Sequence, residues 1–321
     1  PPMTILQSIV DNPSYALMRG AGRVANVRKS VAAAKRMACS SSTKRLEIEL
    51  EERMPETLFS GIDRNAFLAE MNRRGCAFGL KLPKQSIDSL LQYAQSTPVF
   101  AFRDERLGFA PDNRMVAQLS LGREILLAQY YNALRDCFAI QELAVDPVLN
   151  WVALRYLGAP PTFLGCNLWW TYPVRTNRED QLEHAHFFHR DIDDFKFIKF
   201  FFYLTDVNPG DGGHWIVAGS HRRSPHICLK DYLITRRFED EEIRAYYDQK
   251  DILEVVGTRG DGFAEDTLCV HKAASPSVQP RLILQLQFAL SNLGVGSDRR
   301  NDSDLQMIDL VKSTRGSECA L

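Results

Sequence analysis

The sequence predicts an α+β protein whose β part is a double-sheet jelly roll. Three observations indicate this class. Helical patterns dominate up to about residue 160, and short segments rich in aromatic and β-branched residues follow from about 161 to 293. Gly, Pro, Asp and Asn separate these segments, as in all-β folds with many turns. The longest strand patterns also have one wholly apolar face, as expected where N-terminal helices pack on the outer face of a major sheet.

The chain opens with a basic leader, residues 1–57. Apolar residues such as Val24, Val27 and Val31 recur in it at helical spacing, with Arg and Lys between them. A helix of this kind either packs on its own domain, which we favour, or makes an outside contact, with an anionic membrane surface or with a partner. Residues 58–296 are the expected main domain, and residues 297–321 are a C-terminal tail.

The first part of the main domain has clear helix signals. Residues 61–75 predict a helix in which Asp63 is the N-cap and Gly75 the C-terminal stop. A short strand over 76–82 and a second helix over 84–96 follow, and residues 123–158 predict two or three more helices, broken near Pro147. The later strands are expected within 166–174, 195–207, 214–219, 252–257, 266–271 and 281–290.

Composition excludes several classes of function. The chain has 321 residues, with 39 Lys plus Arg against 40 Asp plus Glu, so it lacks the basic field of a nucleic-acid binder. Its seven cysteines are scattered without a C-x-x-C pair, which argues against a disulfide framework and favours a reducing compartment. No apolar run reaches the roughly 20 residues of a transmembrane helix. We therefore expect a cytoplasmic protein.

The histidines are unusually concentrated. All seven lie between residues 184 and 271, and "FHRD" places His189 and Asp191 two positions apart. Residues i and i+2 of a strand point to the same face, so both side chains can bind one ion. His271 is the natural third ligand, which would complete the two-histidine, one-carboxylate set typical of non-haem Fe(II). His184 and His186 could instead form an H-x-H site, an alternative that we weigh as the weaker.

The last strand pattern, residues 281–290, separates into two faces. One face carries Leu282 and the alternate apolar residues after it, and the other begins with Arg281. An arginine that points into an apolar barrel is costly unless it meets an anion. Its planar fork suits a carboxylate, so a diacid that binds the metal at one end and Arg281 at the other fits both features.

Two further strands contribute candidate co-substrate contacts. Lys199 and Tyr203 share the face that would line the cavity, although the Lys199 ammonium could equally reach solvent with its stem buried. Asn167 has the alternation of an inward-facing residue on its strand and is a weaker candidate.

Residues 188–222 ("FHRDIDDFKFIKFFFYLTDVNPGDGGHWIVAGSHR") and 260–291 resemble the phytanoyl-CoA dioxygenase family of Fe(II)- and 2-oxoglutarate-dependent oxygenases. With residues 156–173, the resemblance extends over roughly 145–295. It implies a double-stranded β-helix, with His189, Asp191 and His271 as iron ligands and Arg281 on the distal carboxylate of 2-oxoglutarate. It also implies an aromatic residue, Tyr203, beside the co-substrate, and a structural role for His221.

The resemblance implies an oxygenase that uses Fe(II), 2-oxoglutarate and O₂, and that releases succinate and CO₂ as it oxidises a small-molecule or acyl substrate. Related halogenases lack the carboxylate ligand, so Asp191 favours hydroxylation or another oxidation over halogenation. The alternative from another class is a catalytically silent barrel used for binding or assembly, with the leader as its docking element. A third is an oxygenase with another metal or without an oxoacid. The substrate and oligomeric state do not follow from the sequence.

Overall fold

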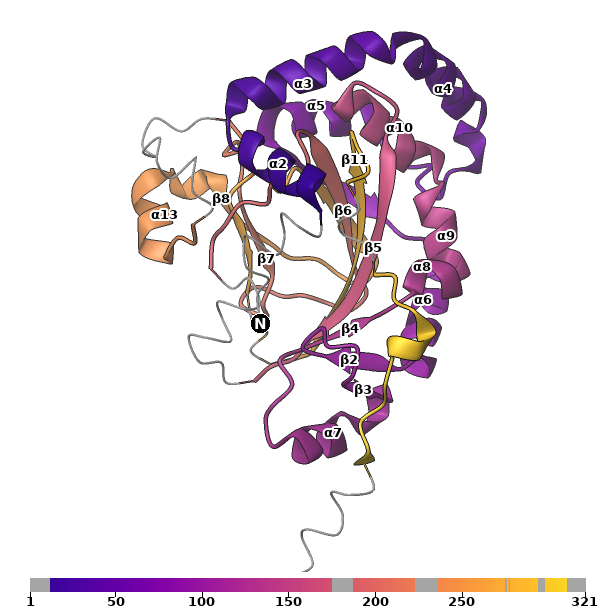
Figure 1. Ribbon diagram of the computed structural model, residues 1–321, viewed down its shortest axis with the longest axis vertical. Helices are drawn as coiled ribbons and strands as arrows, with labels where there is room; N and C mark the ends of the chain where they lie inside the picture. Colours follow the sequence, from indigo (N-terminus) through magenta and orange to yellow (C-terminus); the bar gives the residue numbers. More distant parts are fainter. Residues whose placement is uncertain are drawn as a thin grey trace, which may run out of the picture.

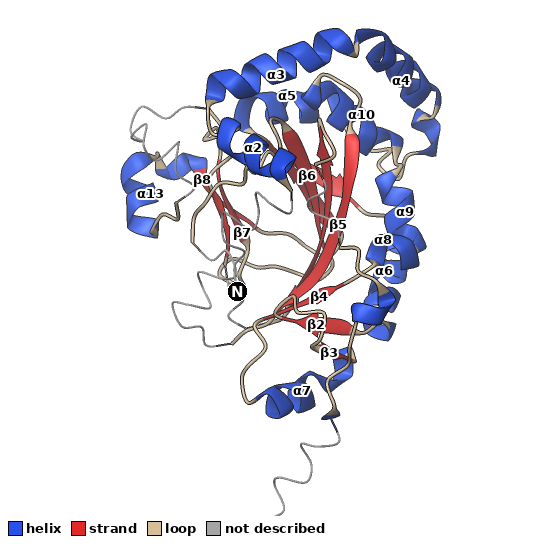
Figure 2. Ribbon diagram, viewed as in Figure 1, coloured by secondary structure: helices blue, strands red, loops and turns tan. Residues whose placement is uncertain are grey.

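A computed structural model of the protein describes residues 12–174, 187–222, 236–274, 276, 278–293 and 298–310. Within this part of the chain, the strands form two antiparallel sheets, drawn in Figures 1 and 2. The larger sheet has the order β1-β9-β6-β11-β5-β4-β2-β3, and the smaller has the order β10-β7-β8. The strands are β1 (Cys76–Lys81), β2 (Val99–Ala101), β3 (Gly108–Phe109), β4 (Leu127–Tyr130), β5 (Thr162–Thr171), β6 (Phe197–Tyr203), β7 (His214–Val217), β8 (Ile252–Val255), β9 (Asp261–Glu265), β10 (His271–Ala273) and β11 (Arg281–Ala289).

Helices cover the outer face of the larger sheet, as predicted (Figure 2). This two-sheet, helix-covered arrangement is the jelly roll that the strand block indicates. One further helix, α13, lies beside the smaller sheet (Figure 1). The helices are α2 (Pro13–Ala21), α3 (Ala25–Ala38), α4 (Ser40–Glu52), α5 (Arg64–Arg74), α6 (Lys84–Ser96), α7 (Arg114–Leu121), α8 (Ala133–Asp136), α9 (Phe138–Ala144), α10 (Pro147–Leu157) and α13 (Asp240–Tyr246).

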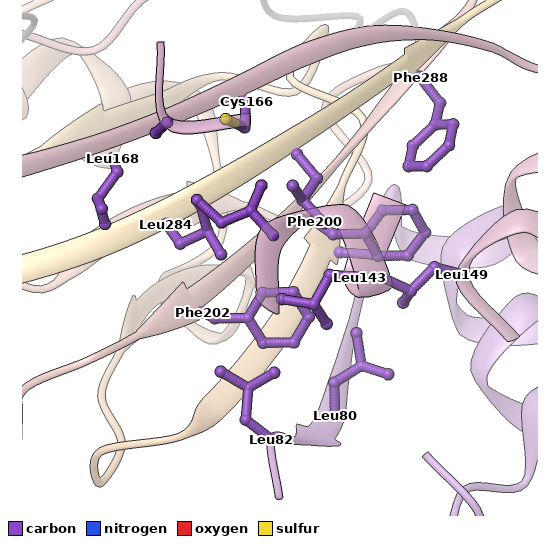
Figure 3. Close-up of a cluster of buried hydrophobic side chains, with 14 of the residues drawn as sticks. Leu80, Leu82, Leu143, Leu149, Cys166, Leu168, Phe200, Phe202, Leu284 and Phe288 are labelled. Atoms are coloured by element: carbon purple, nitrogen blue, oxygen red, sulfur yellow. The ribbon is translucent and has the colours of Figure 1, made fainter. Parts of the chain in front are cut away.

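The alternation of β6 and β11 divides the interior into two apolar clusters. Even-numbered residues of both strands, among them Phe200 and Leu284, pack outward against the helices, where Leu143 and Leu149 meet them (Figure 3). Odd-numbered residues such as Ile283 pack inward between the two sheets. Because side chains on a strand alternate, the same two strands supply the core and line the barrel interior.

The predicted N-cap and C-terminal stop of the first helix of the main domain are confirmed. The Asp63 carboxylate accepts hydrogen bonds from the backbone N–H groups of Asn65 and Ala66, both at 3.0 Å, at the start of α5. Gly75 ends this helix with a φ of 72°, a left-handed conformation that favours glycine.

Three local predictions are wrong. Residues 127–130, expected in a helix, form β4, because a short run buried at every position carries no periodicity that distinguishes a strand from a helix. Strand β9 was missed behind the turn at residues 258–260. His271 begins β10 rather than ending a strand, since residues 266–270 form an irregular turn.

The described part of the leader packs on the main domain. Met18, Ala32 and Leu50 are buried, and α4 packs against α10. Figure 1 shows α3 and α4 arching over α5 and α10. Residues 298–310 of the tail also pack on the body, where the Asp298 carboxylate accepts a hydrogen bond from the Ala133 N–H at 2.7 Å. The leader therefore adopts the first of its two expected arrangements, while the boundaries at residues 57 and 297 stay predictions.

No helix in the described ranges is both long enough and apolar enough to cross a bilayer. The cytoplasmic location stays a prediction.

One carboxylate joins the end of the leader to α10. Asp146 is 3% exposed and accepts hydrogen bonds from the backbone N–H groups of Val148 (2.9 Å) and Leu149 (3.1 Å) as the N-cap of α10. It also accepts hydrogen bonds from the Thr57 hydroxyl (3.0 Å) and the Leu58 N–H (2.8 Å). Asp146 thus satisfies donors from two segments that are far apart in the sequence.

We expect Asp146→Ala to lower the free energy of unfolding by about 3 kcal/mol, because it removes a cap and leaves buried donors without an acceptor. Asp63→Ala, at an exposed N-cap, is the matched control and should cost about 1 kcal/mol. Urea unfolding followed by circular dichroism measures both. Equal losses in the two variants would contradict the bridging role of Asp146.

Candidate functional site

Three side chains from two segments of the chain converge, two from residues 189–191 and one from the start of β10. Ligand-type atoms of His189, Asp191 and His271 all lie within 4.8 Å of one another. The two histidines face each other across an isolated β-bridge, in which each backbone N–H donates to the carbonyl of the other residue at 2.9 and 3.0 Å. Asp191 Oδ1 lies 3.6 Å from His189 Nε2, and Oδ2 lies 3.6 Å from His271 Nε2. The structure thus brings together the three predicted metal ligands.

A backbone carbonyl holds each imidazole by the same ring nitrogen. His189 Nδ1 lies 2.9 Å from the Phe187 carbonyl oxygen, and His271 Nδ1 lies 2.9 Å from the Cys269 carbonyl oxygen. A carbonyl only accepts, so each Nδ1 donates and each Nε2 keeps a free lone pair. Burial lowers the pKa of His189, and burial together with the neighbouring His189 lowers that of His271 to about 4. Both rings are therefore neutral at physiological pH, the form that binds a metal.

Lys199 determines the charge of the carboxylate in this group. Its buried ammonium lies 2.7 Å from Asp191 Oδ2 and 2.9 Å from Asp193 Oδ2. Burial opposes ionisation of Asp191, but the Lys199 ammonium, joined at acidic pH by the protonated imidazoles, outweighs it and holds the pKa of Asp191 far below its usual value. Lys199 thus keeps Asp191 ionised through Oδ2 and leaves Oδ1 free. The expectation that Lys199 could reach solvent is wrong.

The two aspartates after Asp191, at positions 193 and 194, have structural contacts. Asp193 accepts a hydrogen bond from the Gln287 amide at 3.0 Å in addition to its pairing with Lys199. Asp194 is fully buried and accepts hydrogen bonds from the backbone N–H groups of Phe195 and Ser291, both at 2.7 Å. These contacts fix the loop that carries the candidate ligand Asp191.

Arg281, at the start of β11, lies within the barrel with 2% of its surface exposed. Its guanidinium donates to the Gly212 carbonyl and, at 3.3 Å, to the Thr171 hydroxyl. Its Nε has no hydrogen-bond partner, and no carboxylate of the described residues lies within 4 Å of the group. Because burying an uncompensated charge is costly, the arrangement favours an anionic ligand at this position.

Tyr203 and Asn167 also face the interior. The buried Tyr203 hydroxyl donates to the Val255 carbonyl at 2.8 Å and accepts a hydrogen bond from the His214 N–H at 3.1 Å, which ties β6 to the smaller sheet. Asn167 lies opposite Gln285 on β11, and its carbonyl accepts a hydrogen bond from the Gln129 amide at 3.0 Å. Both residues lie on the predicted face, and their contacts with a co-substrate stay predictions.

A buried pair behind His271 was missed. His214 is buried, and its Nε2 lies 2.7 Å from Glu265 Oε2. Burial raises the pKa of Glu265 to about 8 and, with Arg281, lowers that of His214 to about 3. Burial thus favours the neutral form of both groups. The sequence signal was weak, since strand β9, which ends at Glu265, was itself missed.

The remaining histidines do not join the group of candidate ligands. His221 Nδ1 lies 3.5 Å from Cys269 Sγ, which agrees with the structural role expected for it. His184, His186 and His226 lie outside the described residues.

The donor set fits one divalent metal ion of the Fe(II) type. Two neutral imidazole nitrogens and one ionised carboxylate oxygen converge, and Lys199 and two backbone carbonyls orient them. Metal ligands in proteins are commonly held by such outer contacts. His189 and Asp191 are part exposed, so the group opens toward solvent on their side.

The chain also matches a family model in the region that contains the site. The family model described as "Phytanoyl-CoA dioxygenase (PhyH)" matches residues 138–281. The resemblance to the phytanoyl-CoA dioxygenase family is confirmed. The span matched by the phytanoyl-CoA dioxygenase model contains every predicted site residue, from Asn167 to Arg281. No curated protein matches the chain.

Several solved structures are similar at low identity. AviO1 from Streptomyces viridochromogenes Tue57 is 17% identical, with a TM-score of 0.47 over 71% of this chain and 95% of that chain. SnoN, a non-heme alpha ketoglutarate dependent epimerase from nogalamycin biosynthesis, is 15% identical, with a TM-score of 0.45 over 77% of this chain and 96% of that chain. EvdO2 from Micromonospora carbonacea var. aurantiaca, complexed with 2-oxoglutarate, is 17% identical, with a TM-score of 0.46 over 72% of this chain and 92% of that chain.

Proposed function

We propose that this protein is an Fe(II)- and 2-oxoglutarate-dependent dioxygenase that hydroxylates an unactivated C–H bond of a small-molecule or acyl substrate and releases succinate and CO₂. The observation that carries the proposal is the combination of the three candidate ligands with Arg281 on the interior of one barrel. The match to the phytanoyl-CoA dioxygenase family supports the same reaction class.

Each candidate residue has a distinct task. His189, Asp191 and His271 would hold Fe(II), which when bound supplies the activation of O₂. Arg281 would hold the distal carboxylate of 2-oxoglutarate through its guanidinium fork, in place of the missing counter-ion. Lys199 keeps Asp191 ionised for its role as a ligand.

The interior between the sheets is suited to oxidation in the absence of bulk water. Phe201 and Phe263 stack with ring centroids 4.9 Å apart, and both lie in the inner apolar cluster. His214 packs against the same rings and against His271. Such walls exclude water and so protect a reactive site from side reactions.

The choice of hydroxylation follows from Asp191. A carboxylate at this position occupies a ligand site that a halide would otherwise need, so hydroxylation is favoured over halogenation. A small-molecule or acyl substrate agrees with the absence of a basic nucleic-acid-binding field in the composition.

We expect anaerobic addition of Fe(II) and 2-oxoglutarate to produce a weak visible charge-transfer band, because the keto-acid would chelate a ferrous ion held by three protein ligands. Admission of O₂ should then release succinate slowly without any added substrate. Samples that lack either Fe(II) or 2-oxoglutarate are the controls. The absence of both the band and succinate would refute the enzyme hypothesis and favour a silent barrel.

A further inference from the structure

A cavity lies between the leader and the main domain, and none of the three candidate metal ligands lines it. We call it the leader pocket; its volume is about 780 Å³. One wall comes from the leader, where Arg23 precedes α3 and Lys29 and Arg36 lie on it. The opposite wall comes from the main domain and includes Lys196 and Arg222. The pocket therefore exists because the leader is docked on the main domain.

The lining of the leader pocket is strongly cationic. Six of its residues carry a positive charge, and one, Asp266, carries a carboxyl group. Asp266 is already engaged, since it accepts hydrogen bonds from the Tyr156 hydroxyl at 2.6 Å and from the Leu268 N–H at 3.0 Å. The six cationic residues are Arg23, Arg28, Lys29, Arg36, Lys196 and Arg222. In a cavity with partly low-dielectric walls, this excess attracts anions.

Four of these cations have no carboxylate within 4 Å among the described residues: Lys29, Arg36, Lys196 and Arg222. Lys196 is half-buried, and its ammonium donates to the Tyr156 carbonyl and lies 4.4 Å from the centre of the Tyr156 ring. Burial lowers its pKa. Arg222 donates to the Asn72 carbonyl at 2.7 Å. Neutral groups thus orient two cations from the main domain, and neither cation forms an ion pair with a carboxylate of the described residues.

We propose that the leader pocket binds a small molecule or headgroup that carries two or more phosphate groups. Guanidinium groups bind phosphate through paired hydrogen bonds, and lysines add point charge. A ligand with a single carboxylate would leave most of the pocket's positive charge uncompensated. The pocket therefore favours a ligand with several negative charges. The volume lies within the range of small-molecule sites. Val24, Phe195 and Leu268 in the lining provide apolar contacts for the rest of the ligand.

The ligand would bridge the leader and the loops that carry the candidate metal ligands. Phe195 and Lys196 follow Asp191 in one loop, and Leu268 precedes His271 in another. The loop after Asp191 also touches the leader directly. Its Ile192 side chain lies only 3.0 Å from the position that a Cβ on Gly22 would occupy. Phosphate groups shared by both walls would thus hold the leader in place and explain its basic composition.

The test uses the full chain and inorganic pyrophosphate, titrated by calorimetry at low and at physiological salt. A second arm measures sedimentation with phosphatidylcholine vesicles, with and without phosphatidylinositol bisphosphate. The pocket variant is Lys29→Ala/Arg36→Ala, and the matched control is Lys44→Ala/Arg45→Ala. Each double variant removes one exposed lysine and one exposed arginine from the leader helices, and the control positions lie outside the pocket. Neither readout requires metal or turnover.

We expect binding in at least one arm to weaken by about tenfold or more in the pocket variant and to change by less than about twofold in the control. Binding of pyrophosphate identifies a free phosphate compound as the source, whereas binding to the bisphosphate vesicles alone identifies a lipid headgroup. The absence of binding in both arms would overturn the proposal. Equal losses in the two double variants would also overturn it, because they would show general attraction to a basic helix.

Discussion

Asp191→Asn is expected to lower the affinity of the protein for a divalent metal by at least about 100-fold, with loss of Fe(II)- and 2-oxoglutarate-dependent succinate formation. Loss of an outer contact to a ligand costs about 10–100-fold in affinity, so loss of a charged ligand should cost at least as much. Asp191 is the one carboxylate in the group, and its Oδ1 is free of Lys199. An amide at this position is neutral and binds a divalent ion far more weakly.

Asp193→Asn is the matched control for this variant. Both substitutions remove one of the two carboxylates that pair with Lys199, so both disturb the lysine in the same way. Asp191 belongs to the group of candidate ligands and Asp193 does not. Calorimetric titration with Mn²⁺, and with Fe²⁺ under anaerobic conditions, gives the affinities. If both variants lost metal equally, the ion pair with Lys199 rather than the ligand position would be responsible.

Arg281→Ala is expected to raise the KM for 2-oxoglutarate by about 100-fold or more while the affinity for the metal stays unchanged. A hydrogen bond to a charged group contributes about 1.5–3 kcal/mol, and the guanidinium can make two to one carboxylate. Arg281→Lys should have a KM between those of Arg281→Ala and the wild type, since it restores the positive charge without the planar guanidinium fork. Succinate formation at varied 2-oxoglutarate concentration, with calorimetric titration of Mn²⁺, separates the two effects.

The Arg281 variant should still fold, because it removes a buried charge that has no carboxylate partner in the described chain. Thr171→Val is the control, since it deletes the hydroxyl that receives one guanidinium N–H at 3.3 Å and keeps the cation. It should change the KM by only a few-fold. A wild-type KM in Arg281→Ala would show that another group binds the distal carboxylate. It would not contradict the proposed metal ligands.

Strand periodicity made much of the site predictable. Because alternate residues share a face, the order of residues along 281–289 and 197–203 predicted which side chains enter the barrel, and Arg281, Lys199 and Tyr203 do so. The two-residue spacing of His189 and Asp191 also predicted that they would converge, although the strand assumed for them is absent: His189 lies in an isolated β-bridge and Asp191 in the loop after it. Interactions within one element or one turn can be predicted in this way because backbone geometry decides them.

Contacts between distant segments were decided only in the folded chain. The sequence could not assign a partner to Lys199, which pairs with Asp191 and Asp193 because the loop after His189 folds back along β6. Nor could it place His214 on Glu265, since the two residues meet across the two sheets. The leader pocket depends on the same kind of contact, between α3 and loops that follow it by about 160 to 240 residues. The periodicity of a strand determines on which side of the sheet a side chain lies. The packing of remote elements determines which residue it contacts there.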